Sequence, residues 1–552
     1  MTDTRPAVGE LAVIGRDVGR LLVMAAGLMA VSLPVALVFR EPYAVAAFGL
    51  SAVVTAAVGG AAIRACAGAR EPEMKHGMVI AAAGWFTVAV FGSLPFLLTA
   101  HLTPPAVAAS HVPPGASYQS SLLYFRDPIH AFFESMSGWT GSGLTMAVHE
   151  PSLPRSIQWW RSLIQWVGGV GVIVLTVSIL SRPGSGSYTL YRSEAREKRI
   201  HPSIVSTVRT VWKIFLAYTL VSIAAMFVAI RASDYGATLP LWQAGWQAIN
   251  HAMTGLATGG FSVTDDSIAT YGSPLIETVL LPIMTLGAIA FPVHYAVLRN
   301  REVGQLTADL QTRWLFVLLG LGIVGLSVQN VLSVSAVPAA FADAPFLPAG
   351  RGVVDAATTD AVRDSTFQWV SALTCTGFQS APIGEWTAGA KVMVSGAMVL
   401  GGAAGSTVGG IKIIRGYTIA RGIRWQFGRV FLPVNAVVTA RIGDRRLDRS
   451  QMEREFGEAA IVSLLWVVFL VAGSLVLANV TGAGFTYADA LFEVASAQGN
   501  VGLSAGITGP TMSPIAEIMF VFNMWIGRLE IIPVLVFVRS ALYGMGPSIR
   551  GR

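Results

Sequence analysis

Charged side chains are scarce in this sequence: aspartate, glutamate, lysine and arginine make up only 12% of its 552 residues. An ordinary soluble domain carries about 25%. The 58 glycines and 27 prolines do not indicate disorder, because they stand inside long apolar runs, where membrane helices tolerate both residues. The shortage of charge therefore excludes an ordinary soluble protein and indicates a polytopic membrane protein.

Cysteine is nearly absent. The two cysteines, Cys66 and Cys375, stand far apart in the sequence, which excludes a disulfide framework and a cysteine metal site. The sequence also has no convergent catalytic set and no H-E-x-x-H motif, so a membrane-embedded enzyme is not expected. His130 and His251 are interpreted as hydrogen-bonded helix residues rather than metal ligands, because no second ligand stands at a useful spacing.

Long apolar runs bounded by charged residues are the dominant pattern, since a membrane-spanning helix needs about 20 apolar residues. The runs fall near residues 20–39, 43–63, 77–100, 158–181, 211–230, 273–298, 314–336, 388–414, 459–480 and 513–541. Ten spans place both termini on one side of the membrane. When that side is taken as the cytoplasm, most of the 38 lysines and arginines lie on it, which agrees with the positive-inside rule. The opposite face then carries more acids than bases, which would concentrate cations.

Four shorter segments lie between these spans and end in glycine-rich loops. Aligned on Gly143, Gly260, Gly377 and Gly502, they are spaced by 117, 117 and 125 residues. Each glycine is followed by leucine or phenylalanine. The residue six positions earlier is a small hydroxyl in every copy: Ser137, Thr254, Ser371 and Ser496. The residue ten positions earlier is Phe133, Phe367 or Phe492 in three copies and Asn250 in the other.

Each copy reads as a span, a half-crossing helix, an extended loop and another span. Irregular backbone lies at membrane depth only where it lines water or is buried in protein. Glycine allows consecutive carbonyls to point to a common axis, and rings of carbonyls replace the hydration shell of an alkali cation. Close packing between helices is the alternative for any single copy, but four copies in register favour one pore with fourfold pseudo-symmetry.

These segments resemble the filter loops of the Trk/Ktr/HKT superfamily of potassium transporters, over residues 77–541, and the two additional N-terminal spans favour its TrkH-like branch. The resemblance implies an all-α polytopic membrane protein with four pseudo-symmetric span–pore helix–span repeats around one pore, plus two extra N-terminal spans. It divides the chain into an N-terminal extension (1–76) and repeats at 77–200, 201–302, 303–450 and 451–552, the third with a broken second span. It also implies the inner membrane of a bacterium, with both termini cytoplasmic.

The resemblance implies that potassium binds in a filter formed by the four loops. The residues are Thr140, Gly141, Ser142, Gly143, Thr258, Gly259, Gly260, Cys375, Thr376, Gly377, Asn500, Val501 and Gly502. In the fourth loop Asn500 stands where threonine is expected, which leaves the choice between potassium and sodium open.

A glycine-rich stretch follows the third loop and cannot hold a stable straight helix. The stretch includes Gly401, Gly402, Ala403, Ala404, Gly405, Ser406, Thr407, Gly409, Gly410 and Lys412. A flexible segment beneath a filter fits the description of a gate, and the family has an intramembrane gating loop at the matching motif. A small-residue helix interface is the alternative. A phosphate-binding loop is excluded, because Ile411 separates the last glycine from the lysine and no strand precedes it.

Arg528 lies within the last apolar run, where a charge is costly and functional by default. The resemblance suggests that it projects into the pore below the filter as an electrostatic barrier. The alternative is a structural salt bridge with Glu530 or with an acid on another helix.

The expected function is potassium uptake through a gated, channel-like pore. The alternatives are a symporter coupled to protons or sodium, which would need paired ionisable groups at the midplane, and a weakly selective potassium/sodium pathway. The core offers few such groups besides Arg528 and Glu530. No cofactor and no nucleic-acid partner are expected. The resemblance implies a homodimer that pairs with a separate cytosolic nucleotide-binding regulatory subunit. The basic stretches 192–199 and 415–454 are the candidate docking surface for that subunit. The alternative is that these stretches only contact anionic lipid headgroups.

Overall fold

A computed structural model describes residues 6–180, 204–341, 356–431, 433, 439–443 and 445–545. The basic stretch 192–199 lies outside these residues. The regular elements of the described chain are helices except for one short hairpin of strands β1 (Ala440–Ile442) and β2 (Arg445–Leu447). This confirms the helical membrane fold, with the hairpin as a minor addition that the sequence did not predict.

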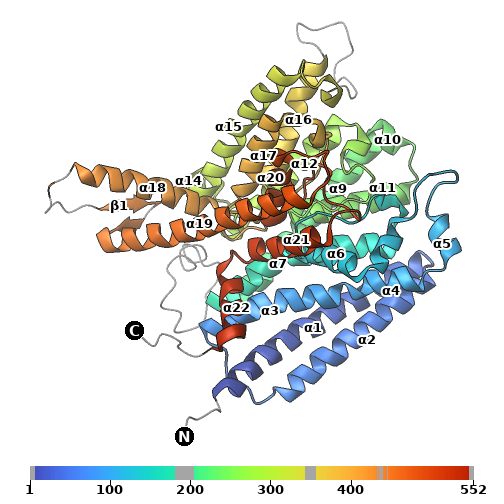
Figure 1. The fold of residues 1–552 in the computed structure, drawn as a ribbon, viewed down its shortest axis with the longest axis horizontal. Helices are drawn as coiled ribbons and strands as arrows, with labels where there is room; N and C mark the ends of the chain where they lie inside the picture. The colour runs from blue at the N-terminus through green and yellow to red at the C-terminus, as the bar shows by residue number, and fades with distance from the viewer. Residues whose placement is uncertain are drawn as a thin grey trace.

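The two extra N-terminal helices, α1 (Pro6–Val38) and α2 (Pro42–Ala65), lie side by side along one edge of the molecule (Figure 1). The turn between them carries Glu41. Its carboxylate accepts hydrogen bonds from the backbone N–H groups of Arg155 (2.7 Å) and Ser156 (3.0 Å), at the start of α7 (Arg155–Leu180). A carboxylate at a helix N-terminus satisfies free N–H groups and complements the helix dipole, so Glu41 joins this pair to the first repeat.

The remaining long helices follow the fourfold pattern. The first spans are α3 (Met74–Gly92) continued by α4 (Leu94–Leu102), α9 (Ile204–Ala232), α15 (Leu310–Ser333) and α19 (Arg449–Val480). The four half-crossing helices are α6 (Pro128–Thr140), α11 (Leu241–Leu256), α16 (Ala356–Leu373) and α20 (Tyr487–Gly499). The second spans are α7 (Arg155–Leu180), α12 (Pro274–Ala288) with α13 (Phe291–Asn300), α17 (Ala388–Val399) with α18 (Ile413–Val430), and α21 (Pro514–Arg528) with α22 (Ile532–Tyr543).

Short helices connect these elements: α5 (Pro105–Ser110), α10 (Asp234–Ala237), α14 (Gln305–Ala308), and the single turns η1 (Ser121–Arg126), η2 (Glu150–Ser152), η3 (Ala269–Tyr271), η4 (Pro338–Phe341) and η5 (Ile383–Glu385). Helices α18 and α19 extend together to one side of the molecule, with the β-hairpin at their far end (Figure 1). There Ile442 and Leu447 pack against Trp425 of α18 and Met452 of α19.

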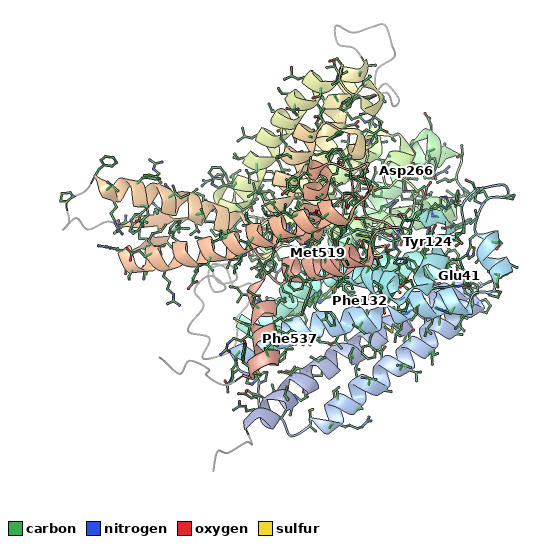
Figure 2. All side chains as sticks on the ribbon, in the orientation of Figure 1. Glu41, Tyr124, Phe132, Asp266, Met519 and Phe537 are labelled. Atoms are coloured by element: carbon green, nitrogen blue, oxygen red, sulfur yellow. The ribbon has the colours of Figure 1, made fainter. Side chains whose placement is uncertain are left out.

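Two second spans that the sequence predicts as continuous are bent. The axes of α12 and α13 meet at 105°, and those of α21 and α22 meet at 115°. Figure 2 shows Met519 and Phe537 on the two arms of the latter bend. In both pairs a proline stands at the second position of the second arm, Pro292 or Pro533. Proline lacks the N–H that would continue the preceding helix and disfavours helical geometry in the residue before it.

By length and apolar composition, six helices in the described part of the chain can cross a membrane, or eight with the two bent pairs. The other two predicted spans, 158–181 and 388–414, correspond to α7 and to α17 with the segment after it. The first half of α7 carries polar residues that face the protein interior: Gln158, Arg161 and Gln165 are all buried. Helix α17 is too short to cross by itself, since its 12 residues rise about 18 Å.

The four repeats are joined in a ring near the starts of their second spans. In every second span, the fourth residue of the helix contacts a side chain 13 or 14 residues before the aligned glycine of the following repeat (Gly143, Gly260, Gly377 or Gly502), and the fourth repeat contacts the first. The ties are Gln158 with Trp246 (2.8 Å), Glu277 with Arg363 (2.9 Å), Lys391 with Asp489 (2.5 Å) and Glu517 with His130 (3.2 Å). The chemistry differs at each junction, so no shared residue type marks these positions in the sequence.

We expect Arg363→Met to lower the free energy of unfolding by about 3–5 kcal/mol, because it leaves the Glu277 carboxylate buried without its cation. The measurement is the thermal unfolding of the purified protein in detergent. The matched control is Glu277→Met combined with Arg363→Met, which removes both charges and should restore most of the loss. Equal destabilisation by the single and double variants would contradict the importance of this tie.

Candidate functional site

The four half-crossing helices end in the same way. Two residues before each aligned glycine, the backbone turns to positive φ, at Gly141 (68°), Thr258 (52°), Cys375 (49°) and Asn500 (54°). The next N–H then bonds back to a carbonyl five residues earlier, at 2.8 Å in the first three loops and 2.9 Å in the fourth. This is the Schellman cap of a helix C-terminus. Four identical caps start the four loops in the same direction.

The aligned glycines Gly143, Gly260, Gly377 and Gly502 all have positive φ, between 76° and 107°. A Cβ atom on any of them would overlap or crowd the carbonyl oxygen before the next glycine around the ring. On Gly377 it would also lie 2.8 Å from the Cα of Gly502, and on Gly502 it would lie 3.0 Å from the Cα of Gly143. The loops therefore close into a ring in the order of the repeats, and only glycine fits both the backbone angle and the space.

In three of the four repeats the small hydroxyl six residues before the glycine hydrogen-bonds its own loop; the buried hydroxyl of Ser137, in the first repeat, has no hydrogen-bond partner among the described residues. Thr254 and Ser371 donate to the carbonyls of Phe261 (2.9 Å) and Phe378 (2.8 Å), the residues directly after the glycines. Ser496 accepts from the N–H of Gly502 (3.0 Å). This contact explains the hydroxyl in the second, third and fourth repeats, and nothing in the structure explains it in the first.

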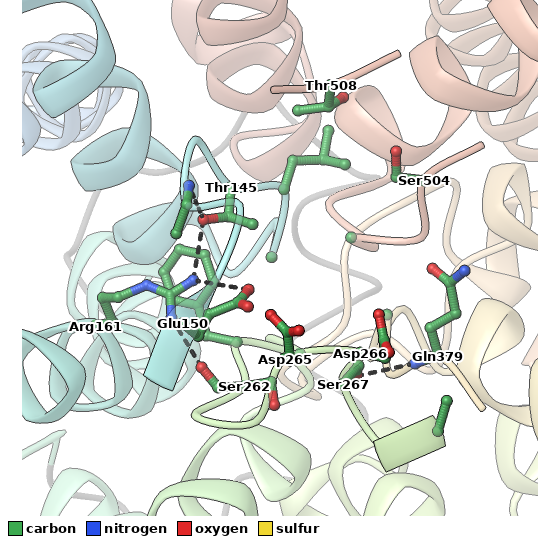
Figure 3. A pocket seen from close by; sticks show the side chains of 18 of the residues that line it. Thr145, Glu150, Arg161, Ser262, Asp265, Asp266, Ser267, Gln379, Ser504 and Thr508 are labelled. Atoms are coloured by element: carbon green, nitrogen blue, oxygen red, sulfur yellow. Dashed lines mark hydrogen bonds and ion pairs between the residues drawn. The ribbon is translucent and has the colours of Figure 1, made fainter. Parts of the chain in front are cut away.

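A cavity of about 450 Å³ opens on one side of the ring, and all four glycines line it (Figure 3). Three acids, Glu150, Asp265 and Asp266, also line it, together with the cation Arg161 and several hydroxyls. Burial raises the pKa of Glu150 to about 8, although Arg161 opposes the shift. Burial also raises the pKa of Asp265. The cavity is therefore a polar vestibule whose charge depends on pH.

We expect cation flux through this vestibule to rise with pH. Above the pKa of about 8 Glu150 ionises and adds a negative charge, which raises the local cation concentration within a Debye length. Rubidium uptake at low salt should increase about twofold between pH 7 and 9, and less at high salt. Glu150→Gln should flatten this part of the profile. A variant that keeps the full rise would exclude Glu150 as its source.

The glycine-rich segment between α17 and α18 lies at the opposite end of the loops. Its backbone is held by α12, where the N–H groups of Ala403 and Thr407 bond to the carbonyls of Ala288 (3.1 Å) and Gly287 (3.2 Å). The Thr407 hydroxyl contacts the Thr258 hydroxyl of the second loop at 2.9 Å. Every residue of 401–410 is buried except Gly405. All the residues expected to form a gate thus lie in one segment, except Arg528, and Lys412 is the N-cap of α18.

The same segment also approaches the fourth loop. A Cβ on Gly409 would lie 3.0 Å from the Oδ1 atom of Asn500 and would overlap the carbonyl oxygen of Gly499. Lys412 folds back to donate to the carbonyl oxygens of Val408 and Gly409. The segment 401–410 therefore contacts both the second and the fourth repeat, on the side of the ring opposite the cavity.

Arg528 is the last residue of α21 and is buried. It donates to the carbonyls of Thr407 (2.7 Å), Gly168 (2.9 Å) and Gly169 (3.2 Å). Its Nη1 atom would lie 3.8 Å from a Cβ placed on Gly141. Within the described residues it makes no ion pair, and Glu530 pairs instead with Arg415. The arginine thus places a positive charge beneath the ring and joins the glycine-rich segment to α7.

The backbone conformation of the fourth loop favours asparagine at position 500. It occupies the positive-φ cap position, which asparagine tolerates better than the threonine or cysteine found in two other loops. Its side chain donates to the carbonyl of Met524 (2.9 Å), on α21. The departure from the expected pattern therefore supports the cap and the contact with α21.

Sequence reasoning underestimated the buried ionisable groups. It singled out the buried Arg528 and the partly buried Glu530, whereas Glu134, Glu277, Lys391, Glu493 and Glu517 are buried as well. They stand inside otherwise apolar helices, and the available signal was their position relative to the aligned glycine or to the start of a second span. No group of three or more metal-ligating side chains occurs in the described ranges. His251 contacts Ser262 (2.9 Å) and Tyr271 (3.0 Å).

Comparisons with known proteins agree with this architecture. The TrkH family, described as cation transport proteins, matches residues 50–543. The Trk system potassium uptake protein TrkH of Salmonella typhimurium is 29% identical, over 95% of this chain and 97% of its own length. The potassium uptake protein TrkI of Halomonas elongata is 30% identical, over 98% and 99%.

The crystal structure of the potassium transporter TrkH from Vibrio parahaemolyticus shares the fold. It superposes with a TM-score of 0.75 over 97% of this chain and 99% of that one, at 24% sequence identity. The family is one of transporters, not enzymes. The chain belongs to the TrkH family of cation transport proteins.

Proposed function

We propose that this protein takes up potassium across the cell membrane through a gated pore in which the four glycine loops form the selectivity filter. The observation that carries the proposal is the closed ring of four positive-φ glycines, each against the carbonyl of the next loop. Such a ring directs backbone carbonyls to one axis, where they can replace the hydration shell of an alkali cation. The relatives named as potassium uptake proteins support the choice of ion.

The remaining parts then take consistent roles. The acidic cavity is the outer vestibule, because it concentrates cations before the filter. The segment 401–410 is the gate, and Arg528 holds it in place and adds an electrostatic barrier. The segment is held by backbone hydrogen bonds to α12 and by Arg528, and Ala403 and Val408 are buried in the hydrophobic core. Opening the gate therefore has to break these hydrogen bonds and move these two side chains.

The same proposal sets the orientation and the partners. With the vestibule outside, both termini and the arginine-rich α18–α19 hairpin lie in the cytoplasm, as the positive-inside rule requires. That hairpin extends from the body (Figure 1) and is the proposed docking surface for a cytosolic nucleotide-binding subunit. A homodimer is proposed from the family resemblance.

The test is ion flux into proteoliposomes that contain the purified protein, with a membrane potential set and no proton gradient. We expect rubidium flux that follows the potential and little sodium flux. Comparable sodium flux would replace the proposal by a weakly selective pathway. Flux only after a proton or sodium gradient is added would indicate a coupled symporter. No rubidium flux, even with the gate loosened by Arg528→Ala, would overturn the proposal.

A further inference from the structure

The residue nine positions before each filter glycine is polar in all four repeats and points to the loop that leaves the ring. These residues are Glu134, His251, Gln368 and Glu493, and all are completely buried on the half-crossing helices. They share a position but not a residue type, so the sequence alignment does not draw attention to them.

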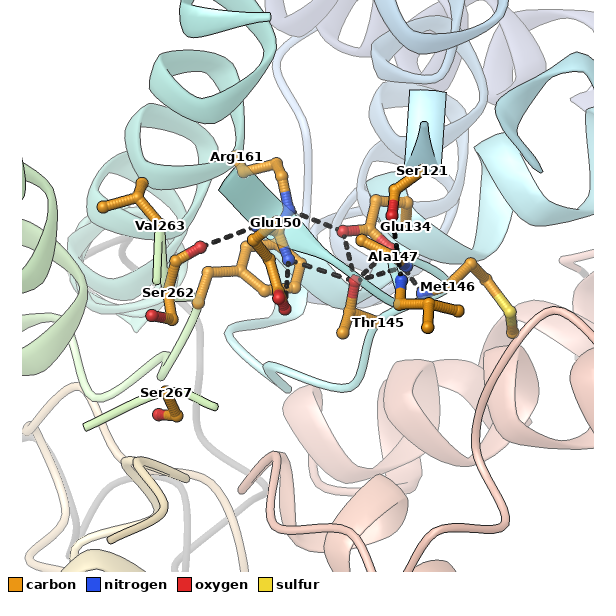
Figure 4. A network of polar contacts seen from close by, with 12 residues as sticks. Ser121, Glu134, Thr145, Met146, Ala147, Glu150, Arg161, Ser262, Val263 and Ser267 are labelled. Atoms are coloured by element: carbon orange, nitrogen blue, oxygen red, sulfur yellow. Dashed lines mark hydrogen bonds and ion pairs between the residues drawn. The ribbon is translucent and has the colours of Figure 1, made fainter. Parts of the chain in front are cut away.

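The two glutamates make the same contacts. Glu134 accepts hydrogen bonds from the hydroxyl of Thr145 (2.9 Å) and the N–H of Met146 (2.9 Å), two and three residues after Gly143 (Figure 4). Glu493 accepts from the hydroxyl of Ser504 (2.6 Å) and the N–H of Ala505 (2.8 Å), two and three residues after Gly502. Carboxylates make stronger hydrogen bonds than neutral acceptors do, so each acid fixes the outgoing part of its loop.

In the other two repeats a neutral side chain at the same position makes a weaker hydrogen bond to its loop. The Nε2 atom of His251 contacts the Ser262 hydroxyl at 2.9 Å, and Gln368 donates to the Ser380 hydroxyl at 3.1 Å. The serines follow their filter glycines by two and three residues. The contact thus recurs at the same position in all four repeats. The side chain that makes it is an acid only in the first and fourth repeats.

The two acids differ in how their charge is satisfied. Glu134 pairs with the buried Arg161 (2.7 Å), which also donates to the carbonyl of Ser262 (2.8 Å) in the second loop (Figure 4). Glu493 makes no ion pair with any described residue. Two more donors complete its set, the N–H of Ile507 (3.1 Å) and the hydroxyl of Thr508 (2.6 Å). A buried carboxylate with this many donors is satisfied without a cation.

We infer that Glu134 and Glu493 are positioning residues for ion selectivity. Each holds the outgoing part of its filter loop, so that the loop carbonyls keep the spacing that distinguishes potassium from sodium. The inference rests on the proposed function of the ring as a filter. Glu493 carries the sharper test, because its role does not pass through a second charged side chain.

The experiment compares three variants by the ratio of rubidium to sodium flux in proteoliposomes. Glu493→Ala removes the acceptor and leaves the N–H groups of Ala505 and Ile507 unpaired, so the ratio should fall about tenfold. Glu493→Gln keeps an acceptor oxygen for those groups, and its amide can donate to the Thr508 hydroxyl, so most of the ratio should return. The control is Gln498→Ala, on the same helix, which loses a bond to the carbonyl of Trp466 on α19 (2.8 Å) and should leave the ratio unchanged.

Each outcome decides between roles. A flux ratio unchanged by Glu493→Ala would overturn the inference. An equal fall of the ratio in Gln498→Ala would also overturn it, because the effect would then come from general destabilisation of α20. If Glu493→Ala does not assemble, Ser504→Ala and Thr508→Val remove one donor each while keeping the acid, and unchanged ratios in both would also overturn it. A wild-type protein that shows no selectivity would instead refute the proposed function.

Discussion

Gly377→Ala is expected to lower the rubidium flux and the rubidium-to-sodium ratio at least about tenfold while leaving the protein folded in the membrane. Gly377 has a φ of 80°, and an L-residue pays about 1–2 kcal/mol there. Its new methyl group would also overlap the carbonyl oxygen of Val501 in the fourth loop. Because the collision is between loops rather than between helices, the ring is distorted and the helical body is not. The measurement is flux into proteoliposomes at equal protein incorporation.

Gly506→Ala is the matched control for this prediction. Gly506 also has positive φ (100°), but a Cβ there meets nothing closer than Phe485 at 3.9 Å. The control therefore carries the backbone strain without filling the ring, and its selectivity should be close to that of the wild type. Equal losses in both variants would mean that backbone strain, not ring closure, controls the flux.

Arg528→Ala is expected to raise the resting flux about tenfold, which corresponds to removing roughly 1.4 kcal/mol from the barrier. The substitution removes a positive charge beneath the ring and frees the carbonyls of Thr407 and Gly168. Both effects favour a more open path. Thermal unfolding measured on the same preparation separates altered gating from lost stability.

Two further variants separate the two effects of Arg528. Arg528→Lys keeps the charge but cannot reach three carbonyls in the same planar geometry, whereas Arg528→Gln removes the charge and keeps a donor. High flux only in the glutamine variant would assign the barrier to charge, and high flux in both would assign it to the tether. Unchanged flux in all three variants would refute the gate assignment.

The sequence carried much of the fold because membrane structure depends on strong local rules. Apolar run length predicts spans, and four glycines in register predict equivalent loops. Their common cap geometry was not signalled in this way, because three of the four cap residues with positive φ are Thr258, Cys375 and Asn500. The closure of the loops into a ring depends on contacts between repeats. The bends before Pro292 and Pro533 were also signalled locally, although the sequence analysis treated both runs as straight.

The buried polar network was out of reach for a different reason. The ties between repeats pair unlike residues, such as Lys391 with Asp489 and Glu517 with His130, and each partner comes from a different repeat. Likewise, the choice of Arg415 rather than Arg528 as the partner of Glu530 depends on how α18 packs near the end of α21. Neither spacing nor residue type determines such pairings.

What the sequence by itself determined was the class of protein, its fourfold repeat and the four glycines at its centre, because hydrophobicity and backbone freedom are properties of single residues and short segments. Only the tertiary structure decided which buried charges meet, where the segment 401–410 crosses, and which side chains brace the loops. Those contacts depend on distance and direction between segments far apart in the chain, and in a low-dielectric interior each polar group must find a specific partner.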